Sequence, residues 1–406
     1  MKPLIRIVTC GSVDDGKSTL LGRLLAQTGS LPTDTVELAR TTRRPGSAIP
    51  VGDIDYSLVT DGLEAERDQG ITIDVAYRHL YLPSGRRAIL ADAPGHEQYT
   101  RNMAVAASTA DVAILLADAM RGTRTQTHRH LTVCALMGVS VVILAVNKLD
   151  GVDWSQDVFD SISAEVEATA QRVGLTTVIA VPASALTGAN VTEPSPSLPR
   201  HSGPTLLGWL DQGEIEPDVD AGARVRVQTI LRTTEFRGYA GVLSSGSLRP
   251  GDELKVSATG QTAVVTRLLA LKGEEPVELD GAVPGQSVAV ELDRDIDITR
   301  GDLLSAVADA PEPANRFSAD VVWLSEEPLA HGRSYILRSG PLEVPTVITA
   351  VRHQLDVADG EQRLVQHRHR LGEIEDVDLV ARPIDERSQL GIPAVSLVAE
   401  VHASCQ

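Results

Sequence analysis

The sequence has little cysteine, little positive charge and no long apolar run. Its 406 residues include only three cysteines, and 37 basic side chains stand against 55 acidic ones, which gives a formal net charge of −18. The cysteines, at positions 10, 134 and 405, have neither the spacing of a metal site nor the even number of a disulfide framework, so we expect Cys10 and Cys134 to be small buried residues. The acidic balance counts against a protein whose main task is to bind nucleic-acid phosphates.

No apolar stretch reaches the roughly 18 residues that a helix needs to span a bilayer. Met1-Lys2-Pro3 leads directly into a strand-like run and not into a signal peptide. We therefore expect a cytoplasmic protein without a membrane partner. The length allows two or three domains, each with its own core.

A glycine-rich loop follows the first apolar run. Residues 11–18 read Gly-Ser-Val-Asp-Asp-Gly-Lys-Ser, after a strand-like Leu4–Val8 and before leucines spaced as on a helix. In such a loop the backbone N–H groups and the helix N-terminus bind phosphate, Lys17 reaches the outer phosphates, and the Ser18 hydroxyl binds Mg²⁺. The alternative is a glycine turn without ligand, which the flanking strand and helix disfavour. The predicted phosphate site comprises Gly11, Ser12, Val13, Asp14, Asp15, Gly16, Lys17, Ser18 and Thr19.

A second motif lies after the apolar run 88–91. It reads Asp92-Ala93-Pro94-Gly95-His96, at the carboxyl end of a predicted strand, where doubly wound sheets bind ligands. Asp92 is suited to hold Mg²⁺ through water, and Gly95 lets its own N–H approach a γ-phosphate. This loop is therefore predicted to sense whether that phosphate is present.

A third motif predicts which base is bound. Asn147-Lys148-Leu149-Asp150 follows the apolar run 141–146. A carboxylate at Asp150 can accept hydrogen bonds from N1–H and the N2 amine of guanine, whereas adenine offers neither donor and would leave the carboxylate unpaired. Ser184-Ala185-Leu186, after the run 178–181, is weak evidence alone but fits a loop that closes over guanine O6 with backbone N–H groups.

A polar stretch at residues 64–74 separates the first two motifs and precedes a strand-like Val75-Ala76-Tyr77. We interpret it as a switch, in which the Thr72 hydroxyl completes the Mg²⁺ shell while the γ-phosphate is present. The alternative is a strand entry with no metal role. The predicted metal ligands are Ser18, Thr72 and Asp92.

The distribution of apolar runs, helical patterns and turn residues along the chain predicts three domains. Apolar runs alternate with helical patterns, including 157–173, up to about residue 182, and a Pro- and Ser-rich loop at 190–204 precedes a closing helix at 206–210. Short strands with Gly-rich turns follow, and Ala310-Pro311-Glu312-Pro313 marks a second linker. We predict an α/β P-loop GTPase domain, a mostly parallel sheet with helices on both faces, at 1–215, followed by two small β-barrel domains at 216–309 and 310–406.

Together these motifs resemble the translation-factor family of GTPases, typified by elongation factor Tu. They are more similar to one branch of it, the GTPase subunit of bacterial sulfate adenylyltransferase. The similarity rests on residues 12–20, 61–78 and 96–103, and it continues at 236–241, 295–304 and 348–357.

The resemblance implies a heteromer that binds GTP, GDP and Mg²⁺. A smaller catalytic partner would join ATP and sulfate into adenylyl sulfate and pyrophosphate, while this subunit hydrolyses GTP. His96 would position the attacking water, with Lys17 and Gly95 beside the γ-phosphate; a solvated loop histidine is the alternative for His96. No nucleic-acid partner is expected.

The chain departs from this family in two places. We expect a shortened third domain and no fused adenylyl-sulfate kinase, because the sequence ends soon after the 388–401 segment. Ala93 stands where a threonine is common, a change we expect to be tolerated. Two other functions stay open: a translation GTPase, and a regulator that binds nucleotide but has lost its catalytic partner. The motifs predict hydrolysis but not what hydrolysis drives.

Overall fold

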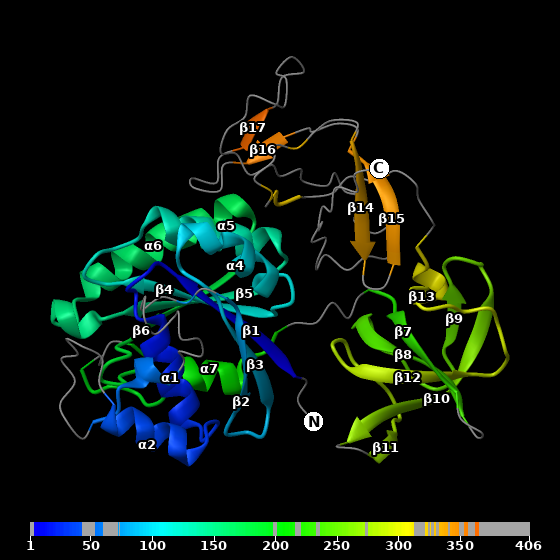
Figure 1. Cartoon of the computed structure of the whole chain (residues 1–406), viewed down its shortest axis with the longest axis horizontal. Helices are drawn as coiled ribbons and strands as arrows, with labels where there is room; N and C mark the ends of the chain where they lie inside the picture. Colours follow the sequence, from blue (N-terminus) through cyan, green and yellow to red (C-terminus); the bar gives the residue numbers. More distant parts are fainter. Residues whose placement is uncertain are drawn as a thin grey trace. The chain divides into compact units, whose positions relative to one another are not determined.

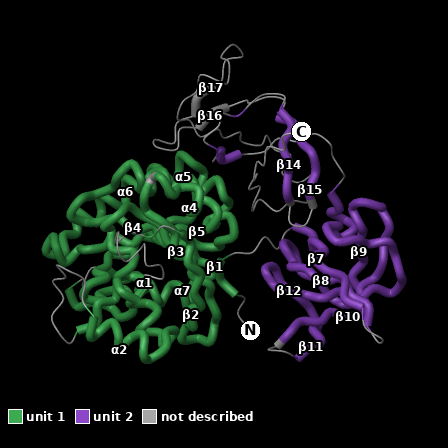
Figure 2. The backbone as a smooth tube through the Cα atoms, viewed as in Figure 1, with its two compact units in different colours: residues 1–215, 355–363 green, residues 216–354, 364–406 purple. Residues whose placement is uncertain are grey.

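The structure is a computed structural model, and the chain divides into two compact units (Figure 2). They are residues 1–215 with 355–363, and residues 216–354 with 364–406. Within them the structure describes residues 4–42, 53–59, 72, 74–197, 201–215, 221–232, 236–272, 275–311, 321–323, 325, 329, 333–339, 342–348, 353–355 and 362–364.

The first unit is built on a six-stranded sheet (Figure 1). Its order is β2-β3-β1-β4-β5-β6. The strands are β1 (Ile5–Gly11), β2 (Ala76–Tyr81), β3 (Arg87–Asp92), β4 (Val112–Asp118), β5 (Val141–Asn147) and β6 (Thr177–Pro182). Only the edge strand β2 is antiparallel to its neighbour; the others run parallel. The central strands β4 and β5 are buried throughout, as expected when helices cover both faces of a sheet.

Helices cover both faces of this sheet (Figure 1). Helices α4, α5 and α6 lie on one face and α1 and α7 on the other. Their bounds are α1 (Lys17–Gln27), α2 (Thr33–Thr41), α4 (Thr100–Ala107), α5 (Thr125–Leu136), α6 (Gln156–Val173) and α7 (Leu206–Gln212), with short 3₁₀ turns η1 (Tyr56–Leu58), η2 (Glu97–Tyr99) and η3 (Leu149–Val152). The longest, α6, begins where the Ser155 hydroxyl accepts from the Val158 N–H and ends at Gly174 with a positive φ of 83°, so both ends are capped.

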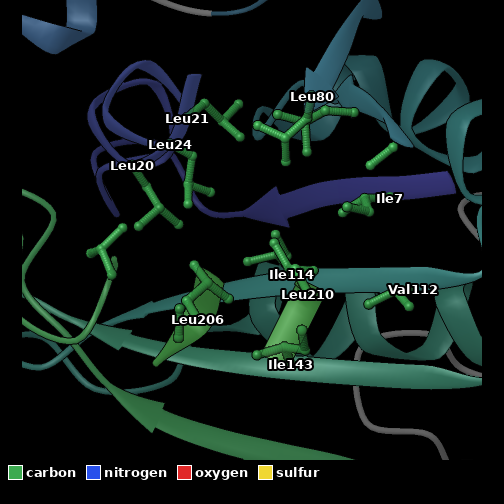
Figure 3. Close-up of a cluster of buried hydrophobic side chains, with 14 of the residues drawn as sticks. Ile7, Leu20, Leu21, Leu24, Leu80, Val112, Ile114, Ile143, Leu206 and Leu210 are labelled. Carbon is green, nitrogen blue, oxygen red and sulfur yellow. The ribbon is translucent and has the colours of Figure 1, made fainter. Parts of the chain in front are cut away.

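The core under α1 and α7 fixes where the site can form (Figure 3). Leu20, Leu21 and Leu24 of α1 pack with Ile7 of β1 in one buried cluster. Leu206 and Leu210 of α7 extend the same cluster to Ile143 of β5, as the labelled side chains show. Burying an aliphatic side chain of this size contributes about 1.5–3 kcal/mol. The packing therefore holds the start of α1 firmly at the carboxyl end of β1.

The second unit contains a closed barrel. Its strands are β7 (Arg224–Arg232), β8 (Arg237–Ser245), β9 (Glu253–Val256), β10 (Thr262–Lys272), β11 (Glu275–Glu278), β12 (Ser287–Leu292) and β13 (Leu303–Ala306), followed by the 3₁₀ turn η4 (Val307–Asp309). In the order β11-β10-β12-β8-β7-β13-β9, strand β9 also pairs with β10 and so closes the ring. Closure leaves the ring of six strands with no free edge.

Further along the chain, β14 (Ser334–Ser339) pairs antiparallel with β15 (Leu342–Val347), and β16 (His353–Leu355) pairs with β17 (Gln362–Leu364). Trp323 packs edge-on against Tyr335, with ring centroids 5.7 Å apart. The predicted fold class is confirmed, an α/β domain followed by antiparallel β structure of the barrel type. The predicted shortening of the third domain concerns residues after 388, which lie outside the described residues.

Candidate functional site

The glycine-rich loop lies between β1 and α1, as its place in the sequence predicts. Strand β1 ends at Gly11 and helix α1 begins at Lys17. Gly16 has a positive φ of 94°, and a Cβ there would lie 2.4 Å from the Asn147 amide nitrogen. Only glycine fits such a backbone so close to another chain segment. Val13, Ser18 and Thr19 are half-buried, and Asp14 is exposed with a φ of 71°.

The side chains of Lys17 and Asp15 form hydrogen bonds with the backbone of their own loop. Lys17 is buried, and its Nζ donates to the carbonyl oxygens of Gly11 at 3.0 Å and Ser12 at 3.1 Å. Burial lowers the pKa of Lys17, against the attraction of Asp92 and Asp15. The Ser12 N–H donates to Asp15 Oδ2 at 2.7 Å. A buried ammonium group at the N-terminus of α1 is suited to bind an anion.

The carboxyl group of Asp15 is buried and has a raised pKa. Its side chain is 2% exposed, and burial raises its pKa to about 6, although the bond from Ser12 and the charge of Lys17 oppose that shift. Near pH 6 this carboxyl therefore gains and loses its proton inside the glycine-rich loop.

The Asp92–His96 segment reaches the same loop from the neighbouring strand. Thr9 and Asp92 are register partners on β1 and β3, and the Thr9 hydroxyl donates to Asp92 Oδ1 at 3.3 Å. A Cβ on Gly95 would lie 2.3 Å from Lys17 Nζ and 2.6 Å from the Gly11 carbonyl oxygen. Glycine is therefore required where this loop passes the lysine.

The remaining residues of this segment differ in exposure. Ala93 and Pro94 are buried, and the Ala93 N–H donates to the Thr9 carbonyl oxygen at 3.3 Å. His96 is half-buried; its Nδ1 accepts from the Gln98 N–H at 3.3 Å, and its ring lies 6.0 Å from that of Tyr99. This bond leaves His96 Nε2 for other contacts.

Asn147, the first residue of the base motif, links the glycine-rich loop to the Ser184–Leu186 segment. Its Nδ2 donates to the Asp15 carbonyl oxygen at 2.7 Å, and its Oδ1 accepts from the Ala185 N–H at 2.8 Å. Lys148, with a φ of 61°, donates from Nζ to the Asp14 carbonyl oxygen at 2.5 Å. Segments that lie more than 130 positions apart in the chain are thus tied together at one edge of the sheet.

Asp150 of η3, the predicted base-binding residue, is half-buried. Its Oδ1 is buried and has no hydrogen-bond partner among the described residues. A buried carboxyl oxygen without a donor costs free energy in the folded protein, so its position suits a ligand that brings N–H groups. In the segment after β6, Ser184 and Ala185 are buried and Leu186 is exposed.

Thr72 is half-buried, and its neighbours 60–71 and 73 lie outside the described residues. The predicted switch at residues 64–74 therefore falls largely outside the described part of the chain, and the metal role of Thr72 stays a prediction.

Three residues of the site were not predicted from the sequence. Asp118 ends β4 and accepts from Lys148 Nζ at 2.8 Å on Oδ2. His130 of α5 is fully buried, and its Nδ1 accepts from the Gly11 N–H at 3.1 Å. Burial lowers the pKa of His130 to about 3, with further lowering from Lys17 and Arg129, so the ring is neutral at pH 7. Arg23 of α1 donates from Nε to the Ala185 carbonyl oxygen at 2.7 Å.

Of these three, only Asp118 had a sequence signal that could have revealed it. It follows the apolar run 112–117, which places a carboxylate at the carboxyl end of a strand, as in the other motifs. His130 and Arg23 are single polar residues in helical patterns, where nothing distinguishes them from surface positions.

The chain is similar to proteins of known family. The family profile of the elongation factor Tu GTP binding domain matches residues 2–276. Sulfate adenylyltransferase subunit 1 of Aeromonas hydrophila is 44% identical over 360 residues, which cover 88% of this chain and 74% of that protein. The protein of the same name from Salmonella newport is 43% identical, over 90% of this chain and 76% of its own length.

This chain belongs to the sulfate adenylyltransferase subunit 1 family. It contains a GTP-binding domain of the elongation factor Tu type. Another relative, the bifunctional enzyme NodQ of Azospirillum brasilense, is 48% identical over 87% of this chain, which spans 57% of the length of that protein. The resemblance that the sequence motifs indicated is thereby confirmed.

Within the part of the chain that the structure describes, no helix combines the length and apolar character of a membrane span.

Proposed function

We propose that this protein is the GTP-hydrolysing subunit of a sulfate adenylyltransferase. In this role it couples GTP hydrolysis to the formation of adenylyl sulfate and pyrophosphate from ATP and sulfate by a separate catalytic subunit. The observation that carries the proposal is the convergence of the three nucleotide motifs at one sheet edge, in a chain 42–44% identical to sulfate adenylyltransferase subunit 1.

The coupling has a thermodynamic basis. Formation of a phosphosulfate anhydride is unfavourable, so it needs a second reaction that releases free energy. A GTPase with two conformations can supply that link if each conformation contacts the catalytic subunit differently.

The phosphates of GTP would lie against the loop from Gly11 to Thr19. In the described structure the Lys17 ammonium bonds two loop carbonyl oxygens, and we propose that it turns from them to the β- and γ-phosphates. Gly95 brings its N–H to the γ-phosphate without a side chain in the way. His96, whose Nδ1 is already bonded, would orient the attacking water through Nε2.

Mg²⁺ fits the oxygen donors that remain. Ser18 offers a hydroxyl and Asp92 a buried carboxylate, and magnesium sites commonly combine one or two carboxylates with substrate phosphates. We propose Ser18, Asp92 and Thr72 as the protein groups around it. When bound, the ion would neutralise charge that develops on the phosphate oxygens.

Guanine would pair with Asp150 Oδ1, which has no hydrogen-bond partner among the residues that the structure describes. Its N1–H and N2 amine supply the donors that this oxygen lacks, while Asn147, Lys148 and the Ser184–Leu186 loop border the base. Adenine would leave the carboxylate unsatisfied.

For the chain as a whole we propose a GTP-binding domain at 1–215 and β domains at 216–309 and 310–406. The division between compact units at residue 215 supports the first boundary. The proposed substrates, ATP, GTP and sulfate, favour a cytoplasmic location.

The test is GTP hydrolysis by the purified chain, alone and with the adenylyltransferase catalytic subunit of the same organism, with and without ATP and sulfate. Adenylyl sulfate is measured in parallel. We expect the partner to stimulate hydrolysis, and adenylyl sulfate to accumulate beyond the level reached without GTP.

A Lys17→Ala chain is the control, since it should bind the partner but not drive the reaction. Absence of any response to the partner and sulfate, with stimulation by ribosomes in its place, would contradict the proposal and favour a translation GTPase.

A further inference from the structure

Arg23 is a buried cation of α1 that contacts the Ser184–Leu186 segment. It belongs to none of the three nucleotide motifs. It is only 8% exposed, on α1, six positions after Lys17. Its Nε donates to the Ala185 carbonyl oxygen at 2.7 Å, and its Nη2 donates to the Leu186 carbonyl oxygen. Burial lowers the pKa of Arg23. A buried guanidinium is costly unless its donors are bonded, so these carbonyl contacts are what make its position tolerable.

The carbonyl contacts set the orientation of the loop at residues 184–188, which we call the base loop. In a trans peptide the carbonyl and the next N–H point in opposite directions. When Arg23 fixes the carbonyl oxygen of Ala185, it therefore also fixes the direction of the Leu186 N–H. The Ala185 N–H is held from the other side by Asn147 Oδ1 at 2.8 Å. The base loop is thus fixed between α1 and the end of β5.

A third element covers the guanidinium. The Arg23 guanidinium carbon lies 4.3 Å from the centre of the Tyr56 ring. Tyr56 belongs to η1, and its backbone comes so close to α1 that a Cβ on Gly22 would lie 1.9 Å from the Tyr56 carbonyl oxygen. Asp55 fixes this turn, because its Oδ1 accepts hydrogen bonds from the Ser57 N–H at 3.2 Å and from the Ser57 hydroxyl at 2.6 Å. Glycine at position 22 is what permits the stacking.

We propose that Arg23 is a positioning residue for guanine recognition: it orients the backbone N–H groups of the base loop toward O6, and Tyr56 holds its guanidinium in place. The inference rests on the proposed binding of guanine nucleotide. It assigns the O6 contact to Arg23, acting through the base loop, and leaves the N1–H and N2 contacts to Asp150.

The two contacts can be separated with altered bases. In 6-thio-GDP a larger sulfur replaces O6, so this analogue reports on the fit of the base loop. IDP lacks the N2 amine, so it reports on Asp150. The measurement is the affinity and dissociation rate of GDP, 6-thio-GDP and IDP for the full chain.

We expect Arg23→Gln to weaken GDP binding about tenfold, mainly through faster dissociation, since charge-assisted hydrogen bonds contribute about that much. The preference for GDP over 6-thio-GDP should fall toward one, whereas the preference for GDP over IDP should not change. Arg23→Lys, which keeps one donor, should recover part of the lost affinity.

Tyr56 provides an independent variant. Tyr56→Leu should weaken GDP binding about two- to fivefold, in line with loss of a cation–π contact, and Tyr56→Phe should leave it unchanged.

The matched control is Arg86→Gln. Arg86 is also buried, at 5% exposure, and it donates from Nη1 to two backbone carbonyl oxygens, of Leu210 at 3.3 Å and Gly213 at 2.9 Å. This variant should be destabilised about as much as Arg23→Gln. It should keep the wild-type ratios of affinity among GDP, 6-thio-GDP and IDP.

Two outcomes would overturn a proposal. A wild-type chain that does not bind GDP would overturn the proposed function itself. A wild-type chain that binds GDP, with an unchanged 6-thio-GDP ratio in Arg23→Gln and Arg23→Lys, would overturn only the role of Arg23. If Arg23→Gln does not fold, Arg23→Lys and Tyr56→Leu carry the same comparison.

Discussion

Asp15 should make the first unit less stable at neutral pH than it would be with a neutral side chain. Its pKa is about 6 in the folded protein, against an ordinary value of 3.8. The native state therefore binds more protons than the unfolded state between these values, and the free energy of unfolding falls as pH rises through this window. The full stabilisation is present below pH 3.8 and is lost above pH 6.

The size of the effect follows from the same two values. A difference of one pKa unit is worth about 1.4 kcal/mol, so the ionised carboxylate costs up to about 3 kcal/mol at pH 7.5. Asp15→Asn removes the charge but keeps an oxygen that can accept from the Ser12 N–H. We expect this variant to be more stable than the wild type by up to about 3 kcal/mol at pH 7.5 and equal to it near pH 4.

The assay is urea unfolding from pH 4 to 8, read on the transition that added GDP shifts, because the chain has two compact units. The quantity compared is the difference between variant and wild type, which cancels other titrating groups such as His130. Asp153→Asn is the control, since Asp153 is exposed and its φ of 51° suits asparagine. A difference below about 0.5 kcal/mol at pH 7.5, or one that does not vary with pH, would refute the reasoning.

Three other substitutions test the nucleotide site. Lys17→Ala should weaken GTP binding by at least about a hundredfold, since it removes a buried charge at the phosphates, and wild-type affinity in a calorimetric titration would contradict the phosphate site. His96→Ala should slow single-turnover GTP hydrolysis about 10²-fold or more with nearly unchanged affinity; equal rates would show that another group positions the water. Asp150→Asn should shift preference from guanosine toward xanthosine diphosphate, and unchanged selectivity in competition binding would remove the assignment of Asp150.

Much of the first unit could be predicted because its signals are local. The strands at 88–91, 141–146 and 178–181 were found within one or two residues of their bounds, since each is a short apolar run. The predicted helix at 157–173 is α6, which begins one residue earlier. Helix α2 was not predicted, because only Ala39 of its nine residues is buried and its apolar pattern is correspondingly weak.

The sequence by itself determined the type of ligand. The glycines, Lys17, Asp92 and Asp150 lie in short motifs directly after apolar runs, and in a parallel sheet the carboxyl ends of such strands meet at one edge. Local order along the chain is enough for that inference, because each motif needs only the strand before it.

Only the tertiary structure decided how the site is held. Arg23 meets its partner 162 positions away, His130 meets Gly11 across 119, and Asp118 meets Lys148 across 30. These contacts depend on which helix covers which strand and on how closely Gly16, Gly22 and Gly95 let the backbone approach. Such distances are set by packing of the whole unit, and no pattern within one segment encodes them.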